Sequence, residues 1–421
     1  MNAYDSSISL SDLIENTLQG LSPIQTIMKM AEDHHIKSLG LDPSKVIGFG
    51  GGWCNHSSPD LLIECYRKIS NDPDLFHQSG RYSPIKGSYE CMDQLCQFEK
   101  LIYSIPDLTV ENMILGDSST QLMHDLLRVL QNPGSDVCVL DPTYANYVNT
   151  VKCALPDSAL CFVPALDPNT WSYLSDPQQS LDVLQEYCEH GAKTFIIPVP
   201  DNPTSQIPSD EFIKSAAEIM KDHHGFLILD FAYKALYFDT MPSCYSWSPN
   251  QYENVIMVHS HSKWLSSLGR RFGWIEAHPD VIRGLEKITE STLLSPDTMH
   301  SMATTCFLKE SLKDQSLRKY IEDTRMLYKK TADVLFNQIN THLGWKLLSP
   351  KGGLYTVCPT PHNQDPVSFV ETLLKKTGVL LIPGIGFGPS MSKAVRISYG
   401  PLCYDHEKIE EGIKRIGKYF S

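Results

Sequence analysis

The sequence lacks several features typical of membrane, secreted and nucleic-acid-binding proteins. No window of the 421 residues approaches the roughly 18 uninterrupted apolar residues of a membrane span. The amino terminus has neither the basic start nor the apolar core of a secretory signal. Cations are scarce: 36 Lys and Arg face 49 Asp and Glu, a net charge of −13 at pH 7. Since phosphate-rich partners need basic patches, we expect a cytoplasmic protein that binds neither nucleic acid nor membrane.

The chain also lacks cysteine motifs, internal repeats and low-complexity segments. Its 12 cysteines are scattered without any C-x-x-C pair. This spacing favours reduced, mostly buried thiols over a disulfide framework, and no metal site is predicted. With 42% hydrophobic and 20% charged residues, the composition is that of a globular chain long enough for one large or two ordinary domains.

Short apolar segments alternate with amphipathic ones between about residues 110 and 280. We predict strands at 113–115, 137–140, 194–197, 226–229, 255–258 and 272–275, and helices at 119–130, 180–190 and 210–222. Such alternation predicts an α/β fold with a mainly parallel sheet and helices on both faces. A long helix is predicted at 316–343, and strands at 353–357, 379–382 and 394–398 indicate a smaller α+β domain.

Polar residues follow the predicted strands, at the edge where ligands of such sheets bind. Ser118, Ser119 and Thr120 open a helix whose free N–H groups could bind an anion, although Ser118 or Ser119 could simply cap it. Tyr144 could stack on a flat ligand or pack in the core. Asn202, held before a proline, offers an amide or marks a turn.

Two further strands end in ionisable residues. Asp230 is costly at the end of an apolar strand unless it is paired, and it could instead cap a helix, with Tyr233 in ordinary packing. Lys263 lies in a glycine-punctuated loop, with Ser260 three residues before it and Arg271 eight after, although a surface loop would look similar. Together the strand-end residues predict a pocket for pyridoxal phosphate, which needs a lysine for its Schiff base and a carboxylate for its ring nitrogen.

The motifs extend this interpretation to most of the chain. They are Ser260-x-x-Lys263 with Arg271-x-Gly273, Tyr82-x-Pro84-x-x-Gly87, Asp141-Pro-Thr-Tyr144, Asn202-Pro-Thr, Asp230-x-x-Tyr233 and Arg396-Ile-Ser. With them, residues 46 to 420 resemble a fold-type I pyridoxal-phosphate enzyme of the aspartate aminotransferase (class I/II) family. The resemblance implies a homodimer in which Tyr82 lies near the neighbouring active site.

The resemblance also implies a role for each site residue. Lys263 would form the internal aldimine and later move the proton between Cα and C4′, with Asp230 holding the pyridinium charged. The other implied contacts are to the cofactor's phenolic oxygen (Asn202, Tyr233), its ring face (Tyr144) and its phosphate (Ser118, Ser119, Thr120, Ser260, Arg271, Tyr82). For the substrate they are Arg396 and Asn202 at the α-carboxylate, with Gly51, Gly52 and Trp53 passing over it.

The expected function is an aminotransferase acting between an α-amino acid and a 2-keto acid. The alternatives are another reaction of the same cofactor, namely β/γ-elimination, cyclisation, decarboxylation or oxidation, and a ligand-sensing regulator is less favoured. We expect an N-terminal segment (1–60) that packs with the small domain, a large cofactor-binding domain (61–285), and a connecting helix with the small domain (286–421).

Three positions depart from the family pattern. Ser205 stands where a glycine often follows Asn-Pro-Thr, and His259 and His261 flank the lysine loop, as packed side chains or as groups behind the cofactor contacts. Residues 285–300 contain no arginine, so the second carboxylate fork of dicarboxylate-specific relatives is not evident there. This argues against aspartate or glutamate as the principal amino donor.

Overall fold

The computed structural model describes residues 11, 14 and 23–420. The predictions made for the amino terminus, and part of the predicted segment 1–60, therefore lie outside the described residues. Among the residues that are described, no helix is both long and apolar enough to cross a bilayer.

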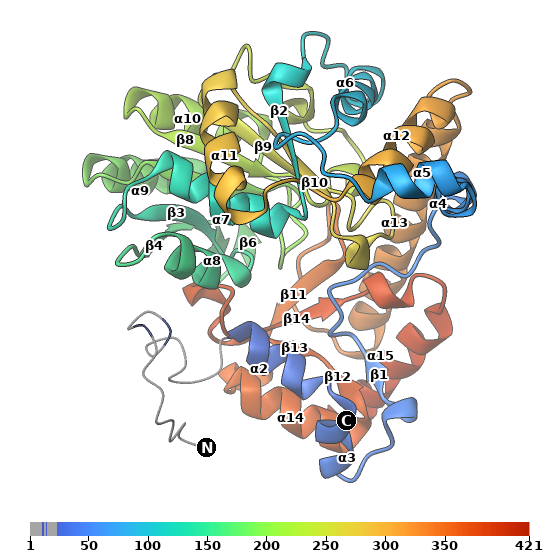
Figure 1. Cartoon of the computed structure of the whole chain (residues 1–421). Helices are drawn as coiled ribbons and strands as arrows, with labels where there is room; N and C mark the ends of the chain where they lie inside the picture. Colours follow the sequence, from blue (N-terminus) through green and yellow to red (C-terminus); the bar gives the residue numbers. More distant parts are fainter. Residues whose placement is uncertain (1–10, 12–13, 15–22, 421) are drawn as a thin grey trace.

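A seven-stranded sheet forms the centre of the larger part of the molecule (Figure 1). Its strands, in spatial order, are β2 (Met113–Gly116), β10 (Gly273–Glu276), β9 (Val255–Ser260), β8 (Phe226–Asp230), β7 (Thr194–Pro198), β3 (Val137–Asp141) and β4 (Leu160–Pro164). All neighbours pair in parallel except β10, which is antiparallel to both β2 and β9. The mainly parallel sheet is thus confirmed, whereas β4 was not predicted.

Alternate residues along each strand enter two separate hydrophobic clusters. In β7, Phe195 and Ile197 pack on one face of the sheet and Ile196 packs on the other, as the twofold repeat of a strand requires. The first face is covered by helices α6 (Tyr89–Tyr103), α9 (Pro177–Glu189), α10 (Asp210–Asp222) and α12 (Thr298–Ser311). The second is covered by α7 (Ser119–Leu130), α8 (Asn146–Ala154) and α11 (Pro279–Thr292). Both faces are therefore buried, which explains why these strands read as continuous apolar runs.

A smaller antiparallel sheet, β11 (Tyr355–Pro359), β14 (Ala394–Ser398) and β13 (Ile382–Pro383), lies at the other end of the molecule (Figure 1). It packs with α13 (Ser316–His342), α14 (Pro366–Thr377) and α15 (His406–Phe420) around its own core. The predicted strand at 379–382 is two strands, β12 (Val379–Leu380) and β13. β1 (Ile47–Gly48) pairs with β12 in parallel, so residues early in the chain join a strand formed near its end.

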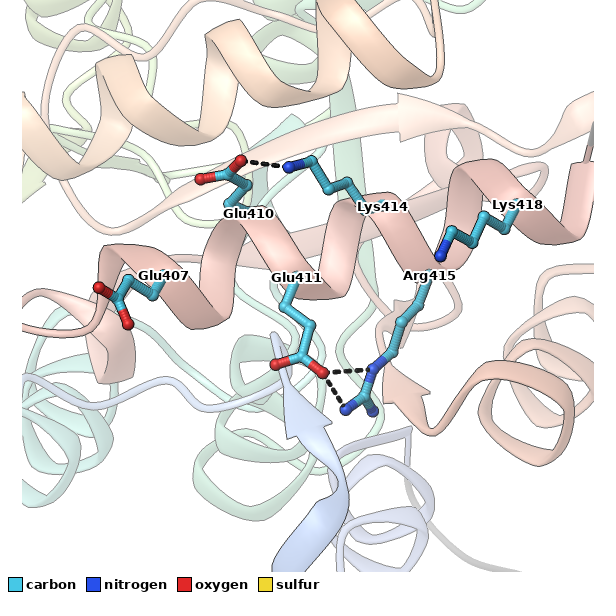
Figure 2. Close-up of a pocket in the computed structure, with 6 residues that line it drawn as sticks. All are labelled: Glu407, Glu410, Glu411, Lys414, Arg415 and Lys418. Carbon is cyan, nitrogen blue, oxygen red and sulfur yellow. Dashed lines mark hydrogen bonds and ion pairs between the residues drawn. The ribbon is translucent and has the colours of Figure 1, made fainter.

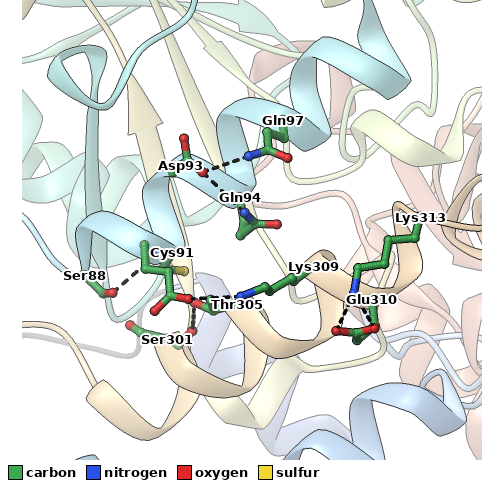
Figure 3. Close-up of polar contacts among 11 residues, drawn as sticks. Ser88, Cys91, Asp93, Gln94, Gln97, Ser301, Thr305, Lys309, Glu310 and Lys313 are labelled. Atoms are coloured by element: carbon green, nitrogen blue, oxygen red, sulfur yellow. Dashed lines mark hydrogen bonds and ion pairs between the residues drawn. The ribbon is translucent and has the colours of Figure 1, made fainter.

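Shorter elements complete the fold. They are the helices α2 (Pro23–Met30), α3 (Asp33–Ser38), α4 (Asp60–Asn71) and α5 (Pro73–Ser79), and the strands β5 (Leu166–Asp167) and β6 (Ser172–Tyr173). Polar contacts line the surface where α6 and α12 approach each other (Figure 3). The hydroxyl of Ser88 caps α6 by accepting a hydrogen bond from the backbone N–H of Cys91. Between the two helices, Lys309 Nζ lies 3.8 Å from Glu90 Oε1. All twelve cysteines are free thiols, and most of them are buried, as the scattered spacing predicted. Cys153 is exposed.

Candidate active site

A cavity of about 830 Å³ opens at the carboxyl ends of the parallel strands. Its lining brings together the start of α7, the turn after β3 and the residues that follow or end β7, β8 and β9. The predicted site residues on it are Gly51, Gly52, Trp53, Ser119, Thr120, Tyr144, Asn202, Asp230, Tyr233, Ser260, Lys263, Arg271 and Arg396. Groups far apart in the sequence therefore converge on one volume, and the hydrogen bond from Arg396 to the carbonyl of Gly50 joins residues 346 positions apart.

Lys263 places its amine inside this cavity. The loop after β9 leaves the side chain half-buried, and Nζ donates a hydrogen bond of 2.6 Å to the carbonyl oxygen of Gly52. The same nitrogen lies 5.5 Å from the centre of the Tyr233 ring. Since its hydrogen-bond partner among the described residues is a neutral carbonyl, the amine is held in place without an ion pair to a carboxylate of that part of the chain.

Asp230 is buried at the end of β8 and has two donors. The hydroxyl of Tyr147 donates to Oδ2 at 2.7 Å, and the backbone N–H of Ala232 donates to Oδ1 at 3.0 Å. Burial raises the pKa of Asp230, and the hydrogen bonds and the charge of Lys263 offset this only in part. A cationic ligand atom beside this carboxylate would favour its ionised form. Tyr147 was not predicted, although it lies one helical turn after Tyr144 and their rings meet edge to face.

The start of α7 and the loop after β9 line one part of the cavity with groups that can attract an anion. Ser119 and Thr120 are the first residues of α7, where free N–H groups and the helix dipole attract negative charge. Arg271 adds a guanidinium, and Gly273 lets β10 approach, because a Cβ at this position would lie 2.8 Å from Ser119 N. Ser118, by contrast, caps α7 by accepting from Gln121 N and does not line the cavity, so its phosphate contact stays a prediction.

Arg396 is a buried residue of the same cavity lining. It donates to Asn202 Oδ1 at 3.0 Å and to Gly50 O at 3.1 Å, and its guanidinium carbon lies 4.3 Å from the Tyr355 ring centre. Its Nε has no hydrogen-bond partner among the residues that the structure describes. A guanidinium held this way keeps donor capacity for an incoming carboxylate.

Tyr233 and Tyr355 are linked through their hydroxyl groups at 2.7 Å, and burial raises the pKa of Tyr233 well above its usual value. Tyr355 lines the cavity and was not predicted; the glycine pair that precedes its strand was the available signal.

The departure at Ser205 has a local explanation. Its φ is 55°, the region that favours glycine, and its hydroxyl accepts from Tyr355 N at 2.9 Å.

Tyr82, like Ser118, is a predicted site residue that does not line the cavity. Its side chain is 83% exposed and is not among those that line the cavity, so a contact with the cofactor would require a second copy of the chain. Trp53, at the cavity entrance, is 50% exposed.

The two histidines of the lysine loop differ in their surroundings. His261 stacks on Phe272 at 4.6 Å, and burial lowers its pKa to about 3, which marks it as a packed neutral ring. His259 stacks on Trp274 at 4.6 Å, and its ring nitrogens lie 3.7 Å from Glu99 and 3.3 Å from Glu276.

Lys234 completes a buried charged cluster of four residues with these three. Its Nζ lies 2.6 Å from Glu99 Oε2. Burial raises the pKa of Glu99, and Lys234 offsets only part of this shift. Despite burial, the pKa of Glu276 is lowered, because its interactions with His259, Lys234 and the Trp274 N–H outweigh the effect of burial.

A second hollow lies on the outer face of α15 (Figure 2). Its lining has three acidic side chains followed along the helix by three basic ones, and two ion pairs, Glu410–Lys414 and Glu411–Arg415, follow the helical repeat. Exposed pairs at this spacing are typical of a solvated helix face, so this hollow does not compete with the cavity as a functional site.

The fold and the cavity define an α/β enzyme with an amine, a buried carboxylate and an anion site around one pocket. The chain matches the family "Aminotransferase class I and II" over residues 44–416. It is 28% identical to an LL-diaminopimelate aminotransferase of Maridesulfovibrio salexigens (91% of this chain, 93% of the relative). It is 26% identical to an aspartate aminotransferase of Pyrococcus horikoshii (89% and 90%). The solved aspartate aminotransferase from Thermus thermophilus with maleate superposes with a TM-score of 0.82 at 22% identity (98% and 99% covered).

The chain therefore belongs to the class I and II aminotransferase family. Members of this family transfer amino groups between amino acids and keto acids with pyridoxal phosphate, which confirms the predicted reaction class and cofactor. The donor set of the cavity fits this cofactor: an amine for its aldehyde, a carboxylate for its ring nitrogen, and a helix start with a guanidinium for its phosphate.

Proposed function

We propose that this cavity catalyses transamination with Lys263 as the residue that holds the cofactor and transfers the proton. The observation that supports this most directly is the convergence of Lys263, Asp230 and Arg396 on one cavity. When bound, pyridoxal phosphate supplies the electron sink that stabilises the charge left as the substrate loses its α-proton. The Lys263 amine then carries that proton between the substrate Cα and the cofactor C4′.

The remaining side chains orient the two molecules. Asp230, held by Tyr147, would hold the ring nitrogen in its protonated form, while Asn202 and Tyr233 would bond the phenolic oxygen and Tyr144 would cover the ring. The phosphate is held by Ser119, Thr120, Ser260 and Arg271, with Ser118 at the same helix start. Arg396, beside Asn202, binds the α-carboxylate through its two-pronged guanidinium.

We also propose that the enzyme is cytoplasmic and forms a homodimer. Within each chain, we place the domain boundaries at about residues 60 and 285. The exposure of Tyr82 supports the dimer, because only a neighbouring subunit could bring this ring to a phosphate. Gly51, Gly52 and Trp53 would then close over the substrate at the entrance of the cavity, where Gly52 already contacts Lys263. Sedimentation of the purified holoenzyme tests the assembly.

The function is tested by absorbance spectroscopy of the purified holoenzyme. Addition of an amino acid should bleach the yellow form of the cofactor, and a 2-keto acid should restore it. Borohydride reduction should fix the cofactor on Lys263, as located by mass spectrometry. Lys263→Ala should abolish both results, whereas Lys287→Ala, at a lysine whose side chain is 81% exposed, should change neither.

Other products would redirect the assignment. Release of ammonia with a keto acid, of carbon dioxide or of peroxide, without recovery of the yellow form by a keto acid, would favour elimination, decarboxylation or oxidation by the same residues. Reductive attachment of the cofactor to Lys263→Ala would contradict the role of this lysine.

A further inference from the structure

The cavity is charged on one side and apolar on the other. Among the described residues, its charged lining groups are Lys263, Arg271, Arg396, Asp230 and Asp33. The proposed function uses the first four for the cofactor and the α-carboxylate. The remaining group, Asp33 at the start of α3, is itself a carboxylate and is exposed.

The apolar side begins next to Arg396. Ile382 pairs with Arg396 in the register of β13 and β14, and the Phe387 ring centre lies 5.0 Å from the guanidinium carbon. A Cβ on Gly50 would lie 3.0 Å from Ile382 Cδ1, so side chain and backbone are closely packed there. The wall continues over β1, β12 and the two N-terminal helices, through Met28, Ala31, Ile36, Pro43, Val46 and Leu380.

We propose that the preferred amino donor has a large uncharged side chain, apolar or aromatic, and that dicarboxylic amino acids are poor donors. This inference rests on the proposed function, because it takes Arg396 as the α-carboxylate site. A side-chain carboxylate in this cavity would lose water without gaining a described cation, which is unfavourable. Each apolar CH₂ buried against the wall should increase kcat/KM by about fourfold.

Single-turnover rates with the holoenzyme test the proposal. The absorbance change should be followed with leucine, methionine and phenylalanine, with aspartate and glutamate, and with lysine and LL-diaminopimelate. We expect kcat/KM for the best uncharged donor to exceed that for each charged donor by at least about 100-fold. A charged donor that matches or exceeds it would overturn the proposal. If no amino acid changes the spectrum, the proposed function itself fails, which is a separate outcome.

A charge reversal at Asp33 tests whether this end of the cavity receives the side chain. Asp33→Arg should raise kcat/KM for aspartate or glutamate by about tenfold relative to the control Asp33→Asn, because it supplies the missing cation. The rate with leucine should change less than threefold between the two variants. Thermal unfolding of both variants controls for an effect on α3. Equal rates with dicarboxylates in two folded variants would show that the side chain points elsewhere.

Discussion

The substitution Lys234→Met should destabilise the enzyme strongly, although Lys234 does not line the cavity. The Lys234 and Glu99 side chains are 5% and 0% exposed, and 2.6 Å separates their charged atoms. Methionine fills a similar volume but leaves Glu99 without its nearest cation. Among the described residues, the second oxygen of Glu99 has no hydrogen-bond partner, and the His259 ring nitrogen Nδ1 lies 3.7 Å from it.

The expected cost is about 4 kcal/mol of unfolding free energy. Removal of one partner from a buried ion pair typically costs about 3–5 kcal/mol, because the other charge remains buried. Lys234 Nζ also lies 4.0 Å from the Tyr103 ring centre and 5.0 Å from that of Phe231. Methionine keeps the apolar part of these contacts and loses the cation–π part, about 0.5–2 kcal/mol.

The pH dependence of the cost has a defined sign. Burial already raises the pKa of Glu99, and the loss of Lys234 should raise it further. A raised carboxyl pKa stabilises the fold at low pH, and this contribution is lost as pH rises through the folded pKa. Between the folded pKa of Glu99 in the wild type and its higher folded pKa in the variant, the deficit of Lys234→Met should therefore shrink by up to about 1.4 kcal/mol per unit of falling pH.

Urea unfolding, followed by circular dichroism and tryptophan fluorescence at about pH 7.5 and about pH 5.5, measures both effects. Lys287→Met at an exposed site is the matched control and should stay within about 0.5 kcal/mol. The double variant Lys234→Met with Glu99→Gln should recover at least half of the loss, since no unpaired charge remains at that pair. A loss below about 1 kcal/mol, or a loss independent of pH, would refute the buried-charge explanation.

Three further variants test other parts of the structure. His261→Phe should make the unfolding free energy less dependent on pH in the acid range. Because burial lowers the pKa of His261 to about 3, the native protein loses up to about 1.4 kcal/mol of unfolding free energy per pH unit as the pH falls below about 6.5. Urea midpoints of both proteins at several pH values measure the difference. Tyr147→Phe should lower kcat about tenfold in steady-state assays with little change in KM, because Asp230 loses its side-chain donor; an unchanged kcat would contradict this. Ser205→Gly relieves a positive φ but removes the acceptor of Tyr355 N, so calorimetry should show a stability change below about 1 kcal/mol; a loss above about 2 kcal/mol would mean that the hydrogen bond dominates.

Local patterns in the sequence predicted most of the large sheet. The helix expected at 119–130 is α7 with the same limits, because its apolar repeat and its serine cap are both local signals. Strand direction is not such a signal. β10 was expected from its apolar residues, but its antiparallel insertion between β2 and β9 depends on the path of the connecting loops. β4, at the edge of the sheet, was missed although Leu160 to Val163 form an apolar run, and its first three residues are only half-buried.

The site residues also divide into those that local sequence patterns predict and those that depend on the fold. Strand-end positions and motifs placed Lys263 and Asp230 correctly on one cavity, since the carboxyl ends of parallel strands share an edge. Tyr147 and the Lys234–Glu99 pair escaped prediction because their partners are distant in sequence; 135 residues separate Lys234 from Glu99. A buried lysine gives no sign of its partner before the fold is known.

The pairing of β1 with β12 bears on the order in which a nascent chain can assemble. All seven strands of the large sheet have been synthesised by Glu276, so this sheet could form while the remainder is still being translated. The carbonyl of Gly50, however, accepts a hydrogen bond from Arg396, which is synthesised 346 positions later. The parts of the cavity lined by Gly50 and Arg396 therefore come together only when synthesis is nearly finished. A chain released early could possess a folded sheet and the lysine yet have no completed pocket, so premature termination should yield a structured but inactive product.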